Sequence, residues 1–261
     1  MKTDIVFTSF LAFGNLTFIG CQEDEPINIG PSPMGIKFKV LNKKYSLPVT
    51  DGTKSAPATN ASIIWDTAQL VVSQIKCEAE LKSLTTHRDP IEIEYIWTGP
   101  KAVDLFNDQQ VPCNFMLKTG FYNDIELKVF GNKQDTGKKP VFYLAGSYTS
   151  TQNSKIPIAI KVYSDIQFKT EKDCVTVTKE SVDITGYIKL YLDKLMVGID
   201  PVMLDNSKLT NGVIVISEES NQTLYYAILG NLVKNHKCYF EHKGMSKNKH
   251  KNNADYNEIG N

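Results

Sequence analysis

The chain has 261 residues, of which 41% are hydrophobic and 10% aromatic, enough for one well-buried core or two small ones. Lysine plus arginine and aspartate plus glutamate each total 29, so the formal net charge is zero. A nucleic-acid-binding protein should carry a basic stripe, and none appears in the part expected to fold, so we expect no nucleic-acid partner.

The first 25 residues have the pattern of a secretory signal. Lys2 precedes an apolar run from Ile5 to Ile19, which is shorter than the roughly 20 residues of a bilayer-spanning helix. The run ends in Phe18-Ile19-Gly20-Cys21, which resembles the lipobox of bacterial lipoproteins, with Phe18 where that family usually has Leu. The resemblance implies cleavage before Cys21, acylation of Cys21 with palmitate or similar chains, and stable anchoring in the outer membrane.

The acidic cluster Glu23-Asp24-Glu25 follows the cysteine at once. It is similar to the export tag of surface lipoproteins in one Gram-negative lineage, which implies a cell-surface location; the alternative is a plain solvated charge run. We expect residues 1–20 to be a lipoprotein signal peptide, 21–35 an acidic tether rich in Pro and Gly, 36–240 a β-sandwich domain, and 241–261 a disordered tail rich in Lys and Asn.

Alternating apolar and polar residues predict strands along most of the domain. The first runs from Ile36 to Val40, and the longest candidate covers residues 62–82. In that segment the alternation slips between Trp65 and Ala68 and again between Val72 and Ile75, which predicts a bulge or bend at each point. Further strands are expected at 91–97 (bounded by Gly99-Pro100), 122–130, 141–144, 156–168, 174–177 and 213–216, with a turn at 131–139 joining two of them as a hairpin.

Two late segments have helical spacing. Residues 188–196 match a helix ended by Gly198, although the segment could begin as a strand. Ser220 or Asn221 can cap a helix that places Leu224, Ile228 and Leu232 on one face. Many short extended segments and few helices predict a mainly β fold, an antiparallel β-sandwich with one or two short C-terminal helices.

Val103-Asp104-Leu105-Phe106 and the stretch from Gly120 to Leu127 resemble a pattern found in uncharacterised lipoprotein domains. That resemblance covers about residues 60–170. It implies an immunoglobulin- or transthyretin-like sandwich and a surface, adhesion or fimbria-like role, and it provides no functional residue.

Beyond Cys21, the chain contains Cys77, Cys113, Cys174 and Cys238. Export would expose them to oxidising conditions, so one or two disulfides are one interpretation, with three possible connectivities for two bonds. Free buried thiols are the other.

No phosphate-binding loop, hydrolase elbow or zinc-protease motif occurs, so we expect no enzyme and no cofactor. Ser73 and Lys76 match S-x-x-K in letters, but they lie in a predicted strand, where this spacing sends the side chains to opposite faces. His236, Cys238 and His242 could ligate zinc only with a further group that the sequence lacks, so we expect no metal site.

Three weaker features could carry function. Glu92 and Glu94 share one face of a strand and could act as paired carboxylates, or simply be outward polar residues. Trp65 and Trp97 could form a sugar-binding platform or lie in the core. Asp66-Thr67-Ala68 resembles a bacterial O-glycan acceptor, which would make Thr67 the modified residue.

The leading hypothesis is a non-catalytic lipoprotein whose sandwich serves adhesion, assembly or capture of a glycan or protein ligand. The binding loops would lie together at one end, since rigid scaffolds carry function on loops. A carbohydrate-binding partner of an outer-membrane uptake complex is the first alternative, and a hydrolase with carboxylate chemistry is the second. The candidate loops are 43–60, 83–90, 131–139 and 200–212.

Overall fold

The structure is a computed structural model that describes residues 32–47, 60–82, 90–107, 113–133, 139–177, 183–234 and 236–243. It is mainly β, which confirms the fold class expected from the sequence. The sheets are not wholly antiparallel as predicted, because residues 34–41 pair in parallel with 184–191 and residues 214–216 with 158–160, and the described part contains three helices instead of one or two. Its elements in chain order are β1 (Ser32–Leu41), β2 (Lys44–Ser46), β3 (Ser62–Leu81), β4 (Ile91–Asp104), β5 (Asn114–Leu117), β6 (Gly120–Gly131), β7 (Phe142–Thr149), β8 (Lys155–Val162), β9 (Ile166–Val177), β10 (Asp183–Tyr191), α1 (Leu192–Leu195), α2 (Pro201–Asp205), β11 (Leu209–Thr210), β12 (Val213–Ile216), α3 (Gln222–Lys234) and β13 (His236–Lys243).

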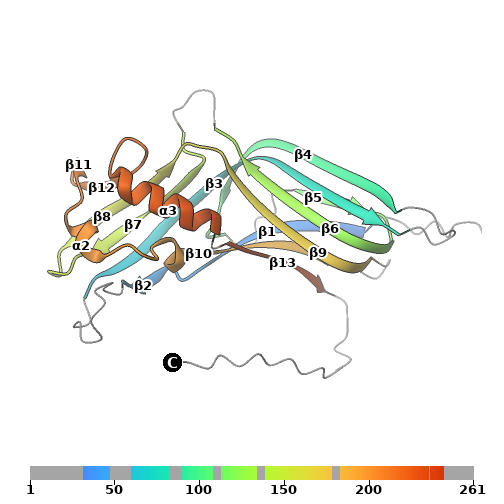
Figure 1. Cartoon of the computed structure of the whole chain (residues 1–261), viewed down its shortest axis with the longest axis horizontal. Helices are drawn as coiled ribbons and strands as arrows, with labels where there is room; N and C mark the ends of the chain where they lie inside the picture. Colours follow the sequence, from blue (N-terminus) through green and yellow to red (C-terminus); the bar gives the residue numbers. More distant parts are fainter. Residues whose placement is uncertain are drawn as a thin grey trace, which may run out of the picture.

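The described strands form two sheets (Figure 1). The larger has the order β11-β12-β8-β7-β3-β6-β9, with β2 and β4 paired to the other edge of β3, and the smaller has the order β13-β10-β1-β5. The small sheet packs against one half of the large sheet, where Phe38 of β1 meets Phe168 of β9 edge-on, with ring centroids 6.5 Å apart. The two sheets therefore share one apolar core.

The long strand β3 is the axis of the molecule. Its first half pairs with β7 and its second half with β6, both antiparallel. Its pairing register shifts between Trp65 and Thr67 and between Val72 and Gln74, which confirms the two predicted bulges. Gly146 of β7 lies opposite the first bulge, where a Cβ atom would approach the carbonyl oxygen of Ile64 to 2.0 Å. Only glycine permits this separation.

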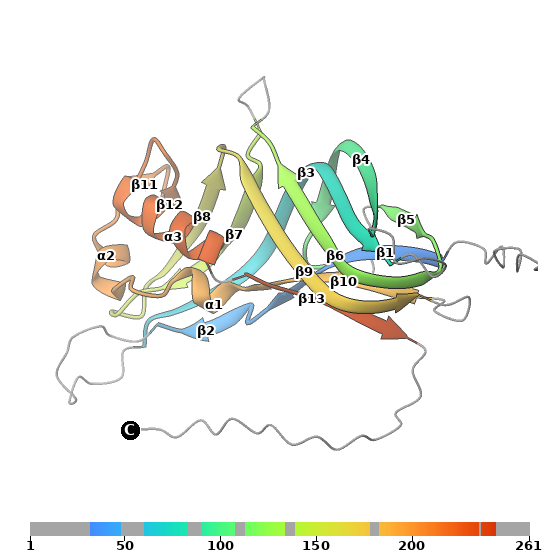
Figure 2. The ribbon, with the colours of Figure 1, turned by 45° about the vertical axis from the view of Figure 1, so that its right-hand side comes forward.

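The prediction of a hairpin around residues 131–139 is wrong. β6 and β7 do not pair with each other; they lie one after the other along the same edge of β3 (Figure 2). Likewise β8 pairs with β7 and β9 pairs with β6. A strand of 20 residues is long enough to hold two partners end to end, so a local turn signal does not decide which strands become neighbours.

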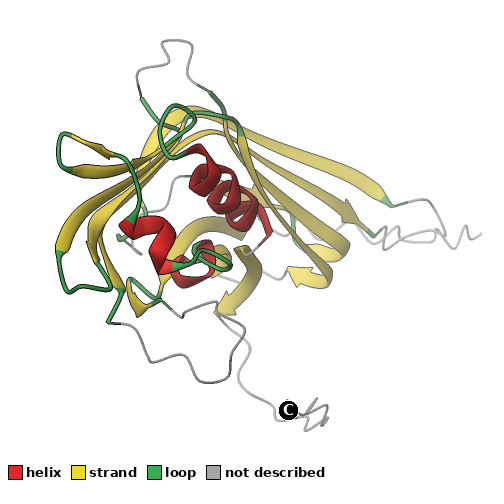
Figure 3. Cartoon of the chain, turned by 60° about the vertical axis from the view of Figure 1, so that its left-hand side comes forward, coloured by secondary structure: helices red, strands yellow, loops and turns green. Residues whose placement is uncertain are grey.

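The helices pack on the concave face of the large sheet, at the end away from the small sheet (Figure 3). The predicted α3 is confirmed, with Leu224, Tyr225, Ile228 and Leu232 buried. The segment 188–196, predicted as a helix that could begin as a strand, does both. β10 continues to Tyr191, and a single helical turn, α1, follows.

Pro201, beyond the expected helix end, begins a further helix, α2. It occupies the first turn, where its missing N–H costs nothing. The carboxylate of Asp200 caps this helix by accepting a hydrogen bond from Val202 N at 2.8 Å.

Several boundaries differ from those expected. The segment 156–168, predicted as one strand, is divided between β8 and β9, and the segment 174–177 is the end of β9. β1 begins at Ser32, inside the segment 21–35 expected to be a tether, because β10 and β5 pair with it on both edges. β4 continues through Gly99-Pro100 to Asp104 along β3. β13 extends from His236 to Lys243, where the sequence suggested the start of a tail, because it adds to the edge of β10.

The start of β1 and the end of β13 lie at the same end of the molecule, because Met34, Ile184 and His242 form one cross-strand row. The helices lie at the opposite end (Figure 1). Among the described residues, none of the helices is long and apolar enough to cross a bilayer. Residues 1–31 and 244–261, including Cys21 and the acidic cluster at 23–25, lie outside the described part.

Candidate functional site

The outer face of the sandwich, formed by β4, β3, β6 and β9, carries a dense array of charges. Apolar side chains of these strands point toward the small sheet, and the alternate positions point outward. The strand register aligns the outward charges in three neighbouring rows. We name them the lysine row (Lys76, Lys128, Lys169), the glutamate row (Glu94, Glu78, Glu126, Glu171) and the outer acidic row (Glu92, Glu80, Asp124, Asp173).

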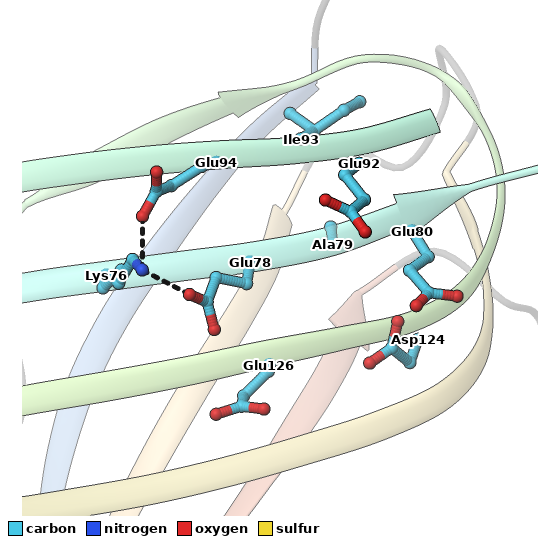
Figure 4. A pocket seen from close by; sticks show the side chains of 9 residues that line it. All are labelled: Lys76, Glu78, Ala79, Glu80, Glu92, Ile93, Glu94, Asp124 and Glu126. Atoms are coloured by element: carbon cyan, nitrogen blue, oxygen red, sulfur yellow. Dashed lines mark ion pairs between the residues drawn. The ribbon is translucent and has the colours of Figure 1, made fainter. Parts of the chain in front are cut away.

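The lysine and glutamate rows form a continuous chain of ion pairs. Lys76 contacts Glu94 (2.5 Å) and Glu78 (Figure 4). Lys128 Nζ bridges Glu78 (2.6 Å) and Glu126 (2.8 Å) in the same way. Lys169 then joins Glu126 at 3.0 Å to Glu171 at 3.8 Å. Each lysine thus connects two glutamates of adjacent strands, one of which lies on the lysine's own strand.

These contacts keep two members of the glutamate row, Glu78 and Glu126, ionised. Hydrogen bonds from Lys128 and Lys76 lower the pKa of Glu78 to about 2. Burial acts to raise the pKa of Glu126, but hydrogen bonds from Lys128 and Lys169 outweigh it, and the net pKa is lowered. Carboxylates held in this state cannot donate a proton near neutral pH, which removes them as general acids.

The outer acidic row has no such compensation. Burial, followed by the negative charge of Glu80, raises the pKa of Asp124, and Asp173 and Glu126 add to the shift. A hydrogen bond with the backbone of Glu80 offsets this only in part. Asp124 Oδ1 is buried without a hydrogen-bond partner among the described residues. The ionised form of Asp124 therefore destabilises the folded protein.

A shallow cavity of about 480 Å³ lies over these rows. Figure 4 shows that it joins Glu92 and Glu94, the predicted carboxylate pair, to carboxylates of β3 and β6. Its acidic lining consists of Glu78, Glu80, Glu92, Glu94, Asp124 and Glu126. Facing Cβ atoms of antiparallel neighbours lie about 5 Å apart, so the cavity concentrates negative charge and favours cations. In the described part of the chain, however, no group of three or more His, Cys, Asp or Glu side chains is arranged to hold a metal ion.

The sequence indicated only part of this cavity. The alternation of Lys76, Glu78 and Glu80 along one strand was visible, but their alignment with Asp124 and Glu126 follows from a pairing across more than 40 positions. No local signal contains that register.

Of the two interpretations of the tryptophans, a sugar-binding platform or the core, the structure supports the core. Trp65 is buried, and its indole Nε1 donates a hydrogen bond to the hydroxyl of Tyr45 at 3.1 Å. Trp97 is partly buried and packs against the core. Trp65 in particular stabilises the fold instead of facing a ligand.

Cys77, Cys113 and Cys174 carry free thiols. Burial raises the pKa of both Cys77 and Cys113 to about 12, whereas Cys174 is exposed on β9. The side chains of Cys238, His236 and His242 lie outside the described part.

Two other predicted residues lie in the bulges of β3. Thr67 is half-buried beside the first bulge and pairs with Ala145. Ser73 lies in the second bulge, where its hydroxyl accepts a hydrogen bond from Asn132 N at 2.8 Å. Lys76 forms ion pairs with Glu78 and Glu94, so the S-x-x-K motif does not place a base beside the Ser73 hydroxyl.

The candidate binding loops do not gather at one end, which corrects that expectation. Described residues that border the first and last of these loops, in β2 and in 200–212, lie near the start of β3, because β2 pairs there and Tyr148 of the facing strand β7 donates a hydrogen bond to Asp205 at 2.6 Å. The strand ends that border 83–90 lie at the other end of β3, because Leu81 pairs with Ile91.

Comparison of the chain with protein-family models, curated proteins and solved structures finds no significant match.

Proposed function

We propose that this chain is a non-catalytic lipoprotein, anchored through Cys21 in the outer membrane and facing the cell surface, whose β-sandwich serves adhesion, assembly or ligand capture. The observation that carries the proposal is the position of the N-terminal strand. β1 begins at Ser32, a short tether after Cys21, at the end of the molecule opposite the helices.

This arrangement suits a protein that presents a surface away from a membrane. At about 3.3 Å per residue, the 20 residues of β3 span roughly 60 Å. A lipid at Cys21 would hold the sandwich end near the bilayer and direct the helical end outward. The residues of β2 and of 200–212, which lie at that end, would then face away from the membrane.

Two features support binding over catalysis. Lysines lower the pKa of Glu78 and Glu126 in the candidate cavity, so neither can act as a general acid near neutral pH, and the cavity lies on the outer face of a sheet. The uptake-complex alternative is supported by an exposed Trp65 or Trp97 and opposed by burial of both; Trp65 is buried and Trp97 is partly buried, so Trp65 offers no ring for sugar stacking.

Metabolic labelling with an alkyne analogue of palmitate tests the anchor. We expect the full chain to be labelled in a Gram-negative host of the lineage that uses the acidic tag, and Cys21→Ser to lose both the label and the outer-membrane fraction. Replacing Glu23, Asp24 and Glu25 with Ala should keep the label but remove sensitivity to protease added to intact cells. An unlabelled wild-type chain that retains Met1 would refute the proposal.

Binding is tested with the same chain in pull-downs from the native envelope and on glycan arrays. A specific ligand retained by the wild type supports the proposal. Turnover of a polysaccharide or peptide by the purified protein would contradict the non-catalytic part of it.

A further inference from the structure

A second cavity, of about 510 Å³, lies at the helical end of the large sheet. Lysines from three separate segments line it: Lys133 after β6, Lys161 in β8, and Lys208 before β11. Ile160 and Val162, the neighbours of Lys161, are buried on the helix-covered face. Lys161 therefore points to the opposite, outer face.

The backbones of two of these lysines are fixed by side chains. Lys133 N donates a hydrogen bond to the carboxylate of Asp165 at 2.5 Å. The Asn221 side chain binds Lys208 from both sides, accepting from its N–H at 2.9 Å and donating to its carbonyl at 3.0 Å. Asn221 Nδ2 also donates to the carbonyl of Val215 in β12 at 2.8 Å. Fixed backbones reduce the ordering cost that a ligand would have to overcome.

The three lysines outnumber the carboxylates of the cavity. Unlike the lysine row, none of them forms an ion pair within the described residues. Two carboxylates, Glu218 and Glu219, also line the cavity, and Glu218 accepts a hydrogen bond from the hydroxyl of Tyr225 at 3.1 Å. Three lysines against two carboxylates leave a formal excess of one positive charge, which favours a bound anion.

The rest of the lining suits a polyhydroxylated ligand. The ring of Tyr163 and the hydroxyl-bearing residues Thr210, Ser217 and Ser220 surround the lysines. Of these residues Thr210 is exposed, whereas the hydroxyl oxygen of Ser220 is buried and has no hydrogen-bond partner in the described structure. The volume falls in the range of small-ligand sites and fits one or two sugar units. A bare inorganic anion would use only the lysines.

We propose that this cavity binds an acidic sugar unit of a glycan, with its carboxylate or sulfate among Lys133, Lys161 and Lys208, and its hydroxyls against Glu219 and the hydroxyl-bearing residues. This assignment rests on the proposed ligand capture and names its ligand class. It is independent of the acidic cavity at the sandwich end.

Isothermal titration calorimetry tests the assignment, using the chain without residues 1–20 and with Cys21→Ser, since every described element lies at Ser32 or beyond. The probes are digalacturonic acid, its dimethyl ester, which keeps the hydroxyls and loses the charge, and inorganic sulfate. We expect the acid to bind at least about tenfold more tightly than the ester or sulfate, because hydrogen bonds to charged groups are the stronger ones. Raising the salt concentration should weaken this binding severalfold.

Substitution of all three lysines by Met should abolish binding of the acid. Lys155→Met is the matched control, because Lys155 is an exposed lysine of the same strand outside the cavity. Equal affinity for acid and ester, equal affinity for sulfate, salt-independent binding, binding retained by the triple variant, or no binding at millimolar acid each overturns the assignment. Such a failure leaves the palmitate labelling unaffected, and loss of that labelling leaves this binding unaffected, so the two proposals fail separately.

Discussion

Asp124 and Glu126 lie two residues apart on the same face of β6, and we expect their amide substitutions to change stability in opposite directions. Asp124→Asn should stabilise the protein, because it removes a charge that burial and the neighbouring Glu80 disfavour. Asn retains an oxygen that can accept the hydrogen bond from the Glu80 backbone. Glu126→Gln should destabilise it, because it breaks the contacts to Lys128 and Lys169 at 2.8 and 3.0 Å.

The expected magnitudes are small because the face is solvated. A like-charge pair across two strands costs roughly 0.2–1 kcal/mol, so Asp124→Asn should raise the free energy of unfolding by about 0.5 kcal/mol. Surface ion pairs contribute about 0–1 kcal/mol each, and the side chain of Glu126 is only 15% exposed. Breaking two of them with Glu126→Gln should therefore cost about 1 kcal/mol.

Urea unfolding at low salt, from pH 7 down to pH 3, measures both effects. The pKa of Glu126 is lowered in the folded state, so its contribution is present above the ordinary glutamate pKa and is lost as the pH falls toward the lowered value. The pKa of Asp124 is raised, so its penalty exists only where it is ionised and fades as the pH falls through that raised value. Both differences from wild type should thus shrink in acid.

High salt supplies an independent control. At 1 M NaCl the screening length is about 3 Å, and both differences should fall by half or more. Two substitutions with the same sign at pH 7, or differences that persist unchanged in acid and in salt, would show that the charge rows do not have the energetics inferred here.

Two further predictions concern packing and thiols. Gly146→Ala should destabilise the fold by at least about 2 kcal/mol in thermal or urea unfolding, because its Cβ would meet the backbone of β3 at the first bulge. Gly230→Ala on α3 is the control; no atom lies within 4 Å of its added Cβ, and helix propensity predicts a gain of up to about 1 kcal/mol. In the native protein at pH 8, iodoacetamide should modify Cys174 but not Cys77 or Cys113, because burial raises the pKa of these two thiols to about 12. Peptide mass spectrometry measures the modification, and equal rates at all three cysteines would contradict the described core.

Local pattern was sufficient wherever a segment's own side chains decide its conformation. The alternation in residues 62–82 predicted β3, and its two slips predicted both bulges. The spacing of Leu224, Ile228 and Leu232 predicted α3 and its buried face. These features depend on period and on neighbours within a few positions, which a single sequence contains.

Tertiary pairing decided the rest. β6 and β7 could have formed a hairpin, and only the length of β3 places them end to end. Ser32 begins a strand because it pairs with Leu117 of β5, and His236 begins one because it pairs with Leu190 of β10. The charge rows exist because the register brings Glu94, Glu78 and Glu126 into line, and register is a property of strand pairs remote in sequence. The sequence by itself therefore determined which segments are extended and where they bend. The tertiary structure alone decided which charged side chains become neighbours, both in the charge rows and in the lysine-lined cavity.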